Sequence, residues 1–348
     1  MASTLILNFL SGSTVWAQES VSVRADLLFY GDDTEFHGPF RDGETLFGAA
    51  GRLYASAVLN ERVTIDLGVF GDHRYGGGGF ERAVPIASLA IGGPRSMIVI
   101  GTLRARRNTI TGPDRDGPHG LLPPIQRDSL AFERPYEAGL EWTARGLAGT
   151  HDGWLNWQRL NTAEHRERFD TGVHTQGRVV PGLDLGVQIH VVHQGGQLFA
   201  SGPVADSAAY AAGALIDRPV GVLGRASFEV WAAMSRDVPD RQTPAASLTG
   251  RGIFLRAAAA RAGWRGHLIV WRGRDFVKDE GDPNYQSRRL EGSRYRGTRD
   301  YSEAGVSRRF VPAKEVTVDL SGRAHRVEGQ YNYSFRITAI ANLIWRVR

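Results

Sequence analysis

The chain of 348 residues contains no cysteine and no uninterrupted apolar run of eighteen residues. The absence of cysteine excludes disulfides and thiolate chemistry, and it suits a protein that passes through an oxidising periplasm. The absence of a long apolar run excludes a transmembrane helix, which needs about twenty such residues. A transmembrane β-barrel is not excluded. Its strands alternate apolar and polar residues, so its mean hydropathy is as low as that of a soluble protein. The mean hydropathy of this chain is -0.27.

Lysine is the second deficiency of this sequence. Only Lys278 and Lys314 are present, against forty arginines, and the formal net charge is +5. Acidic residues nearly balance the arginines along the whole chain, whereas a nucleic-acid-binding protein gathers its basic residues on one face. We therefore expect no nucleic-acid partner.

The last eighteen residues alternate with a period of two. Every odd position from Tyr331 to Val347 is apolar, and most even positions, among them Asn332 and Arg336, are polar. Successive side chains of a strand point to opposite faces, so this segment has one apolar and one polar face. A strand this long, with aromatic residues near both ends, is typical of a wall between lipid and water. An amphipathic strand of a soluble barrel is the alternative.

The same alternation recurs along the chain, and its connections alternate between short and long. Tight turns are expected at 60–62, 92–95 and 181–182, and long loops at 31–44, 72–82 and 107–136. Transmembrane barrels have short periplasmic turns and long external loops, and an even strand number leaves both termini in the periplasm. The pattern predicts an all-β chain, a transmembrane antiparallel up-and-down β-barrel of about 16 strands, with 14 to 18 possible. A soluble sandwich or propeller is the alternative.

On these patterns the chain resembles the outer-membrane β-barrels of Gram-negative bacteria, specifically the porin-like members with sixteen strands. The resemblance covers the mature chain and rests on pattern, without a specific family motif. Residues 5–10 are mostly apolar, and Val15, Trp16 and Ala17 resemble the small-residue cleavage site of an export signal. We therefore predict a signal peptide at 1–17 and a single outer-membrane β-barrel domain at 18–348.

The segment 108–134 is the longest departure from alternation in the first half of the chain. In the porins that the chain resembles, the third external loop folds into the barrel and narrows the pore. The prolines of this segment, with Leu121, Leu122 and Ile125, favour packing against the inner wall. A solvated surface loop is the alternative. The charged residues expected in a constriction loop are Asp114, Arg115, Asp116, Arg127 and Asp128.

Many charged residues fall on the polar faces of the predicted strands. A charge that faces hydrocarbon costs a few kcal/mol, so these faces require a water-filled or polar-packed interior. Acids and bases are mixed, which fits either ion pairs that plug a narrow barrel or a field across a pore that orients solutes. We expect a pore. The residues predicted to line it are Arg24, Asp26, Asp66, Arg104, Arg106, Glu137, Glu141, Glu229, Asp319, Arg323 and Arg336.

An enzymatic role is the less favoured interpretation of the sequence. A membrane-barrel hydrolase needs a histidine base near the rim, and the candidates are the His151-Asp152 pair, His165, His190 and His193. No serine lies in a nucleophile elbow, and no metal-binding spacing of histidine with glutamate or cysteine occurs. We expect no catalytic residue, no metal and no cofactor.

The function that the sequence favours is an outer-membrane channel for passive diffusion or uptake of small hydrophilic solutes, with some preference for anions. A polysaccharide-export or structural barrel and a rim-located hydrolase are the alternatives. The expected partners are outer-membrane lipid, lipopolysaccharide, small solutes and the barrel-assembly machinery, and the location is the Gram-negative outer membrane. Five tryptophans are expected in girdles at the membrane interfaces, namely Trp142, Trp157, Trp264, Trp271 and Trp345.

Overall fold

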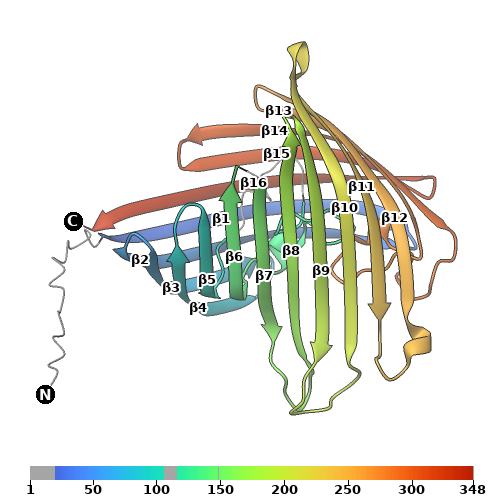
Figure 1. Ribbon diagram of the computed structural model, residues 1–348, viewed down its shortest axis with the longest axis horizontal. Helices are drawn as coiled ribbons and strands as arrows, with labels where there is room; N and C mark the ends of the chain where they lie inside the picture. The colour runs from blue at the N-terminus through green and yellow to red at the C-terminus, as the bar shows by residue number, and fades with distance from the viewer. Residues whose placement is uncertain (1–19, 106–115, 148, 348) are drawn as a thin grey trace, which may run out of the picture.

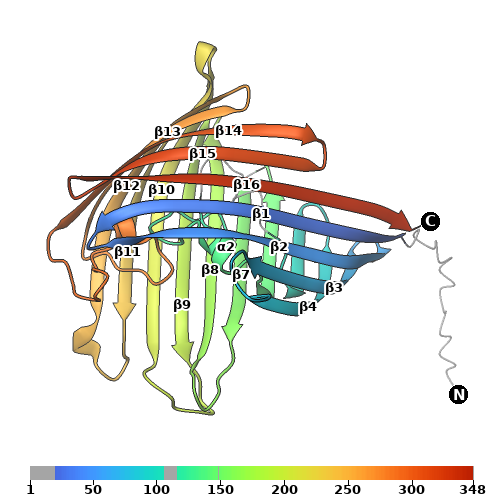
Figure 2. The same ribbon diagram turned by 180° about the vertical axis from the view of Figure 1, so that it is seen from behind.

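The computed structural model describes residues 20–105, 116–147 and 149–347. Within them, sixteen antiparallel strands form one closed barrel, in which each strand pairs with its neighbours in sequence and β1 pairs with β16 (Figures 1 and 2). The predicted fold class and the count of sixteen are confirmed. The strands are β1 (Ser20–Gly38), β2 (Arg41–Asn60), β3 (Val63–Arg74), β4 (Arg82–Gly92), β5 (Ser96–Thr102), β6 (Ala138–Gly146), β7 (Gly149–Arg159), β8 (Glu167–Val180), β9 (Leu183–Gly195), β10 (Ala205–Val220), β11 (Gly224–Val238), β12 (Leu248–Arg261), β13 (Trp264–Arg274), β14 (Thr298–Ala313), β15 (Val316–Val327) and β16 (Gln330–Val347).

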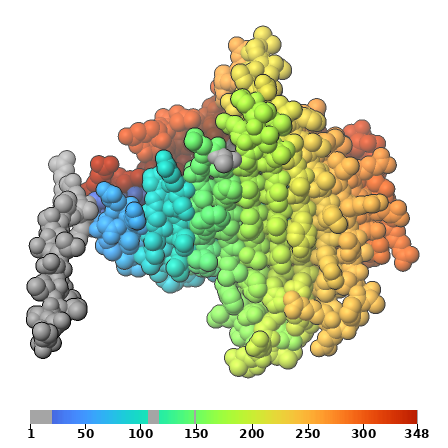
Figure 3. Space-filling view, viewed as in Figure 1, coloured from blue at the N-terminus to red at the C-terminus, as the bar shows by residue number. Residues whose placement is uncertain are grey.

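Alternation along β16 determines which side chains face the membrane. Tyr333, Phe335 and Ile337 are about half exposed on the outer face, whereas Ser334 and Arg336 between them are buried inside the barrel. The other strands follow the same rule, and in Figure 3 the side chains of β6–β12 form a continuous outer wall. No helix of the described residues is long and apolar enough to cross a membrane.

Short turns gather at one end of the barrel and most long loops at the other. Val21 pairs with Val347, so the start of β1 and the end of β16 lie side by side at the short-turn end, which we call the periplasmic end. The loop expected at 31–44 was wrong: β1 continues to Gly38, and only Pro39 and Phe40 separate it from β2. Its polar residues alternate between the two faces of the barrel wall and do not leave it.

Two external loops fold into the barrel. The β5–β6 loop carries the short helix α2 (Leu130–Glu133), which lies inside the barrel in Figure 2, and the β13–β14 loop carries the 3-10 turn η3 (Pro283–Tyr285). The 3-10 turns η1 (Gly221–Leu223) and η2 (Pro244–Ala246) lie in the β10–β11 and β11–β12 connections. The backbone N–H of Asp282 donates to Pro123 O over 2.9 Å, and that of Arg127 donates to Glu280 O over 2.7 Å. The two loops therefore form one plug.

The plug packs on aromatic side chains of the inner wall. Leu121, Leu122 and Ile125 are buried in one apolar cluster with Trp154 and Trp231. Trp271 belongs to the same cluster and is 1% exposed, so its assignment to an interfacial girdle was wrong. Trp271 comes seven positions after the outward-facing Trp264, and an odd number of positions places two residues on opposite faces of a strand. Trp142, Trp157, Trp264 and Trp345 remain on the outer surface and are 40% to 55% exposed.

Candidate functional site

The charged residues predicted for the lumen face the barrel interior wherever the structure describes them. Arg24, Asp26, Asp66 and Arg104 line a cavity of about 360 Å³ at the periplasmic end, below the plug. Glu141, on β6, is 4% exposed. Their role in lining a conducting pore stays a prediction. Arg106, Asp114 and Arg115 lie outside the described residues.

Ion pairs fix the β5–β6 loop to the wall at two places, on β12 and on β16. Arg256 of β12 donates through Nε to Glu229 over 2.6 Å and through Nη1 to Asp116 of the loop over 2.8 Å. Arg336 of β16 donates to Asp32 through Nε and to Asp128 of the loop through Nη1, both over 2.7 Å. These contacts hold the loop inside the barrel, while its role in restricting solute flow stays a prediction.

The remaining predicted residues are also paired. The Nε of Arg127 donates to Glu133 within the loop over 3.0 Å, and Glu137 lies 3.3 Å from Nε2 of His119. Asp319 accepts from Arg309 over 2.9 Å, and Arg323 approaches Glu303 over 3.5 Å. The charged side chains of the plug and of the wall around it are thus largely held in pairs.

Burial perturbs two ionisable groups of the plug. Burial raises the pKa of Asp116 to about 6, although Arg256 opposes the shift. Burial lowers the pKa of Lys278 to about 8, although Glu280 and Asp279 oppose the shift. The Lys278 ammonium donates to the carbonyl oxygen of Asp279.

Asp170, His190 and Glu280 form a buried cluster on the external side of the plug. Their ligand atoms lie within 4.8 Å of one another, as in a metal site. Glu280 already pairs with Arg134 and with Arg168, and Asp170 accepts from Trp154 Nε1 over 2.7 Å. Because cations and hydrogen-bond donors already satisfy both carboxylates, we assign no metal to this cluster.

A second histidine cluster crosses β14, β15 and β16 on the inner face. Nε2 of His325 lies 2.8 Å from Oγ of Ser334, and Nδ1 of His325 lies 2.8 Å from the hydroxyl of Tyr301. That hydroxyl also lies 2.6 Å from Oε2 of Glu303, and His325 Nδ1 lies 3.4 Å from the same oxygen. We call these four residues the relay.

The chemistry of the relay assigns its protons. A carboxylate only accepts, so Tyr301 donates its hydroxyl proton to Glu303. The Tyr301 oxygen must then accept from Nδ1–H of His325, which leaves Nε2 unprotonated and ready to accept from the Ser334 hydroxyl. In this arrangement a serine donates to one nitrogen of a histidine, and a carboxylate orients the other nitrogen through the tyrosine hydroxyl. Enzymes that transfer acyl groups activate a serine nucleophile in a similar way.

Strand register builds the relay. Glu303 pairs directly with His325, and Arg323 pairs directly with Ser334, so these inward side chains are neighbours across the sheet. Nε of Arg323 is buried and has no hydrogen-bond partner among the described residues. Because Arg323 pairs with Ser334 in the strand register, its Nε–H is a candidate donor to an oxyanion formed there.

The relay is closed in this conformation. Ser334 is 1% and His325 2% exposed. The ring of Phe36 packs on His325 at 4.9 Å between centroids, and that of Tyr285, from the β13–β14 loop, packs on Tyr301 at 4.7 Å. A substrate therefore reaches Ser334 only when this cover moves.

Sequence reasoning missed the relay and named other histidines. His190 lies in the Asp170 cluster, His193 pairs with Asp206 over 2.7 Å, and His151 lies 3.2 Å from Thr175. The backbone oxygen of His165 accepts from Thr162. Alternation places His325 on the inner face, but only the register between strands brings it to Ser334.

Comparison with protein families gives a match along almost the whole chain. The model of the family described as lipid A 3'-O-deacylase-type matches residues 14–345. The chain belongs to this family. No curated protein matches it.

Solved structures share the barrel fold of this deacylase-type chain. A loop-deletion form of OmpT, an outer-membrane protein of Vibrio cholerae, aligns with a TM-score of 0.58 and 9% identity over 93% of this chain and 99% of that one. OccK8 (OprE) of Pseudomonas aeruginosa gives 0.54 and 11% over 94% and 99%. An anion-selective porin from Comamonas acidovorans gives 0.53 and 10% over 94% and 100%. The fold is that of Gram-negative outer-membrane β-barrels, as the sequence predicts.

Proposed function

We propose that the protein hydrolyses an acyl ester of an outer-membrane lipid, with Ser334 as the nucleophile and His325 as the general base. The observation that carries the proposal is the 2.8 Å contact between Ser334 Oγ and Nε2 of His325. This assignment departs from the channel that the sequence favours and takes up the hydrolase alternative. The deacylase-type family of the chain supports it.

The reaction follows from the relay. Ser334 Oγ attacks the acyl carbonyl while His325 Nε2 takes its proton, and Nε–H of Arg323 donates to the oxyanion that forms. His325 then gives the proton to the departing alkoxide, and the C–O bond of the ester breaks. Water, deprotonated by His325, then attacks the acyl carbonyl, and His325 returns the proton to Ser334 Oγ as the C–O bond to the serine breaks and the fatty acid leaves. Tyr301 and Glu303 hold the imidazole in the required tautomer.

The substrate that we favour is lipid A, because the family is named for it and its phosphates are anionic. The β13–β14 loop, which covers the relay, also carries the exposed Arg296 and Arg294, of which Arg294 pairs with Asp275 over 2.8 Å. Guanidinium groups bind phosphate bidentately. Binding of an anionic headgroup to this loop is a means of moving Tyr285 away from Tyr301.

The test is the mass of lipid A from cells that produce the protein. Lipid A from cells with the unaltered chain should lose the mass of one acyl chain, and Ser334→Ala should abolish the loss. Ser321→Ala is the matched control, since this inward serine of β15 contacts the backbone oxygen of Arg336 and not a histidine. Unchanged lipid A in all three strains, with the barrel present in the outer membrane, would reject the proposal.

Passage of small hydrophilic solutes is the second candidate function, and the cavities on both sides of the plug favour it. The periplasmic cavity of about 360 Å³ carries Arg24 and Arg104, and an external cavity of about 280 Å³ carries Arg168 and Lys278. A plug that moves aside would join them into a channel lined by seven basic and six acidic side chains, and the small basic excess would give a weak preference for anions.

Planar-bilayer recording tests this candidate. Ohmic steps that favour anions, and that lose this preference in Arg104→Glu, would support it. A silent bilayer, with the folded protein inserted, would contradict it.

A further inference from the structure

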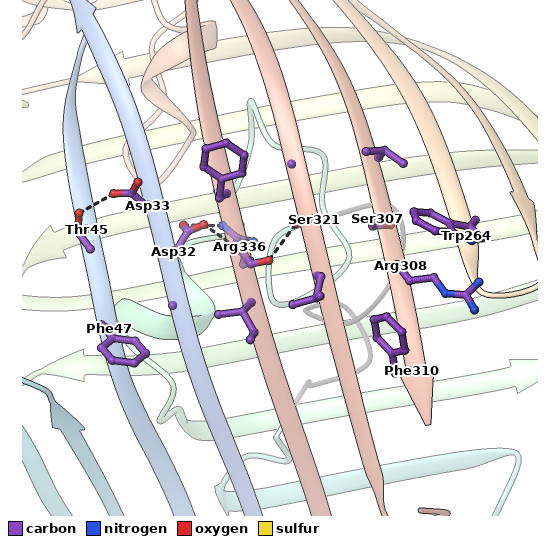
Figure 4. Close-up of a pocket in the computed structure, with 16 residues that line it drawn as sticks. Asp32, Asp33, Thr45, Phe47, Trp264, Ser307, Arg308, Phe310, Ser321 and Arg336 are labelled. Carbon is purple, nitrogen blue, oxygen red and sulfur yellow. Dashed lines mark hydrogen bonds and ion pairs between the residues drawn. The ribbon is translucent and has the colours of Figure 1, made fainter. Parts of the chain in front are cut away.

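An open groove of about 890 Å³ lies on the membrane-facing side of the barrel, over β1, β2 and β13–β16 (Figure 4). Its lining is mostly apolar, and the side chains of Phe47, Phe310 and Trp264 border it. The relay lies on the opposite face of the same wall, so the groove is a separate feature.

Two glycines lie in the lining of the groove, Gly31 between close side chains and Gly322 with room beside it. Gly31 of β1 is flanked by Phe47 and Ile337, which pair with it from the two sides. A Cβ at Gly31 would lie 3.1 Å from the Ile337 side chain and 3.2 Å from that of Phe47. Gly322 leaves an opening, because an added Cβ there would make only ordinary contact with Phe335 at 3.5 Å.

The groove runs across the membrane. Phe47, Gly31, Ile337, Leu320, Arg308 and Trp264 form one continuous row of paired positions across six strands. Phe47 is six residues from the external end of β2, whereas Trp264 is the first residue of β13, at a short periplasmic turn. Because barrel strands are tilted, a row perpendicular to them descends through the bilayer, in the general direction of lipid chains.

A guanidinium group marks the periplasmic end of the groove. Arg308 lies over the rings of Trp264 at 5.1 Å and Phe310 at 5.4 Å, and it donates to the backbone oxygen of Ala262. No carboxylate of the described residues forms an ion pair with it. Figure 4 shows these three side chains together at one side of the groove, with Thr45 and Phe47 at the other.

An arginine on the lipid face is tolerated at the level of the headgroups and costly at the midplane. At the headgroup level its natural partner is a phosphate, which a guanidinium binds bidentately. The groove therefore offers an apolar channel for a lipid chain and a cation for the phosphate attached to it.

We propose that the groove binds one phospholipid of the periplasmic leaflet, with its phosphate on Arg308 and an acyl chain along Gly31 and Gly322. The phospholipid is held whether or not the relay hydrolyses esters. Trp264 and Phe310 hold the guanidinium in place through their ring faces.

Native mass spectrometry of the detergent-solubilised barrel, titrated with phosphatidylglycerol or with diacylglycerol, tests the site. The unaltered protein should bind phosphatidylglycerol at least tenfold more tightly than diacylglycerol. Arg308→Gln should remove this difference, and Gly322→Leu, which fills the groove, should weaken binding of both lipids about tenfold.

Two control variants test whether the effects on lipid binding are specific to the groove. Arg145→Gln removes an exposed arginine beside another periplasmic turn. Gly153→Leu fills space on the outer face of β7, where the atoms nearest to an added Cβ lie at 3.8 Å, in ordinary contact. Both should bind phosphatidylglycerol like the unaltered protein. Equal binding by all four variants, equal affinity for the two lipids, or a preference for lipid A over phosphatidylglycerol would overturn the proposal.

Discussion

Replacement of Arg256 by methionine should loosen the plug. The guanidinium, 5% exposed, joins Glu229 of the wall to Asp116 of the β5–β6 loop. Methionine keeps the apolar stem and removes the charge, which leaves two carboxylates together in the interior. Removal of one partner from a buried ion pair costs about 3–5 kcal/mol.

The expected loss of stability lies at the lower end of that range, because the two acids have other ways to be satisfied. Glu229 still accepts from Trp231 Nε1 over 2.8 Å. The pKa of Asp116 is already raised to about 6 by burial against the attraction of Arg256, so without Arg256 it rises further and the carboxyl takes up a proton. We expect a loss of about 3 kcal/mol near neutral pH.

The pH dependence gives the sign of the effect. A raised folded-state pKa means that the folded protein holds the proton more tightly, so stability falls as pH rises through the interval between the unfolded and folded values. In the unaltered protein this interval runs from the ordinary value of 3.8 to about 6. In Arg256→Met it extends higher, and the difference between the two proteins should grow from pH 6 to pH 8.

Urea-induced unfolding in lipid vesicles, followed by tryptophan emission at pH 5 and pH 8, measures this difference. Arg178→Met is the matched control, because the Arg178 side chain is 64% exposed in its pair with Asp184. Exposed pairs contribute about 0–1 kcal/mol. A loss below about 1 kcal/mol in Arg256→Met, or an equal loss at the two pH values, would refute the buried anchoring of the loop.

Three further variants test other parts of the structure. Lys278→Met should stabilise the barrel towards urea at pH 7 by up to about 3 kcal/mol, because burial lowers the Lys278 pKa to about 8. The gain in stability should vanish as pH rises towards 10.5, the ordinary pKa of lysine, and a gain independent of pH would contradict the assignment. Tyr301→Phe should lower kcat roughly ten- to hundredfold with little change in KM, since the His325 imidazole loses its hydrogen-bonded link to Glu303. The pH profile of hydrolysis should shift as well, and an unaltered profile would mean that Tyr301 contributes packing alone. Ile337→Arg should destabilise insertion into vesicles by about 2–4 kcal/mol, and normal insertion would show that β16 does not face lipid at this position.

Alternation in the sequence was sufficient to predict the barrel, because a period of two assigns each side chain to a face without knowledge of its partners. The same rule failed where polar residues occur on both faces of a strand. Asp32 faces inward and binds Arg336, while Asp33 faces outward and accepts from Thr45, so this part of β1 resembles a loop in sequence. Trp271 was misplaced because its position in β13 was judged by residue type and not by parity.

The relay could not be predicted by the same means. Tyr301, Glu303, His325 and Ser334 belong to three strands, and no motif in the sequence joins them. Their meeting depends on two registers, Glu303 with His325 and Arg323 with Ser334, which the lengths of the turns and small irregularities in pairing determine. The β14–β15 pairing contains such an irregularity between Phe310 and Ala313. A sequence gives the face of each residue, but here only the structure gives its neighbours.

Covalent labelling of Ser334 tests the central claim most directly. The purified barrel, in micelles that contain lipid A, is treated with a fluorophosphonate, and peptide mass spectrometry locates the adduct. The account predicts an adduct on Ser334 that is lost in His325→Ala, because only a serine activated by a neighbouring base reacts at a useful rate. An adduct on a different serine, or none on Ser334 while lipid A loses an acyl chain, would contradict it.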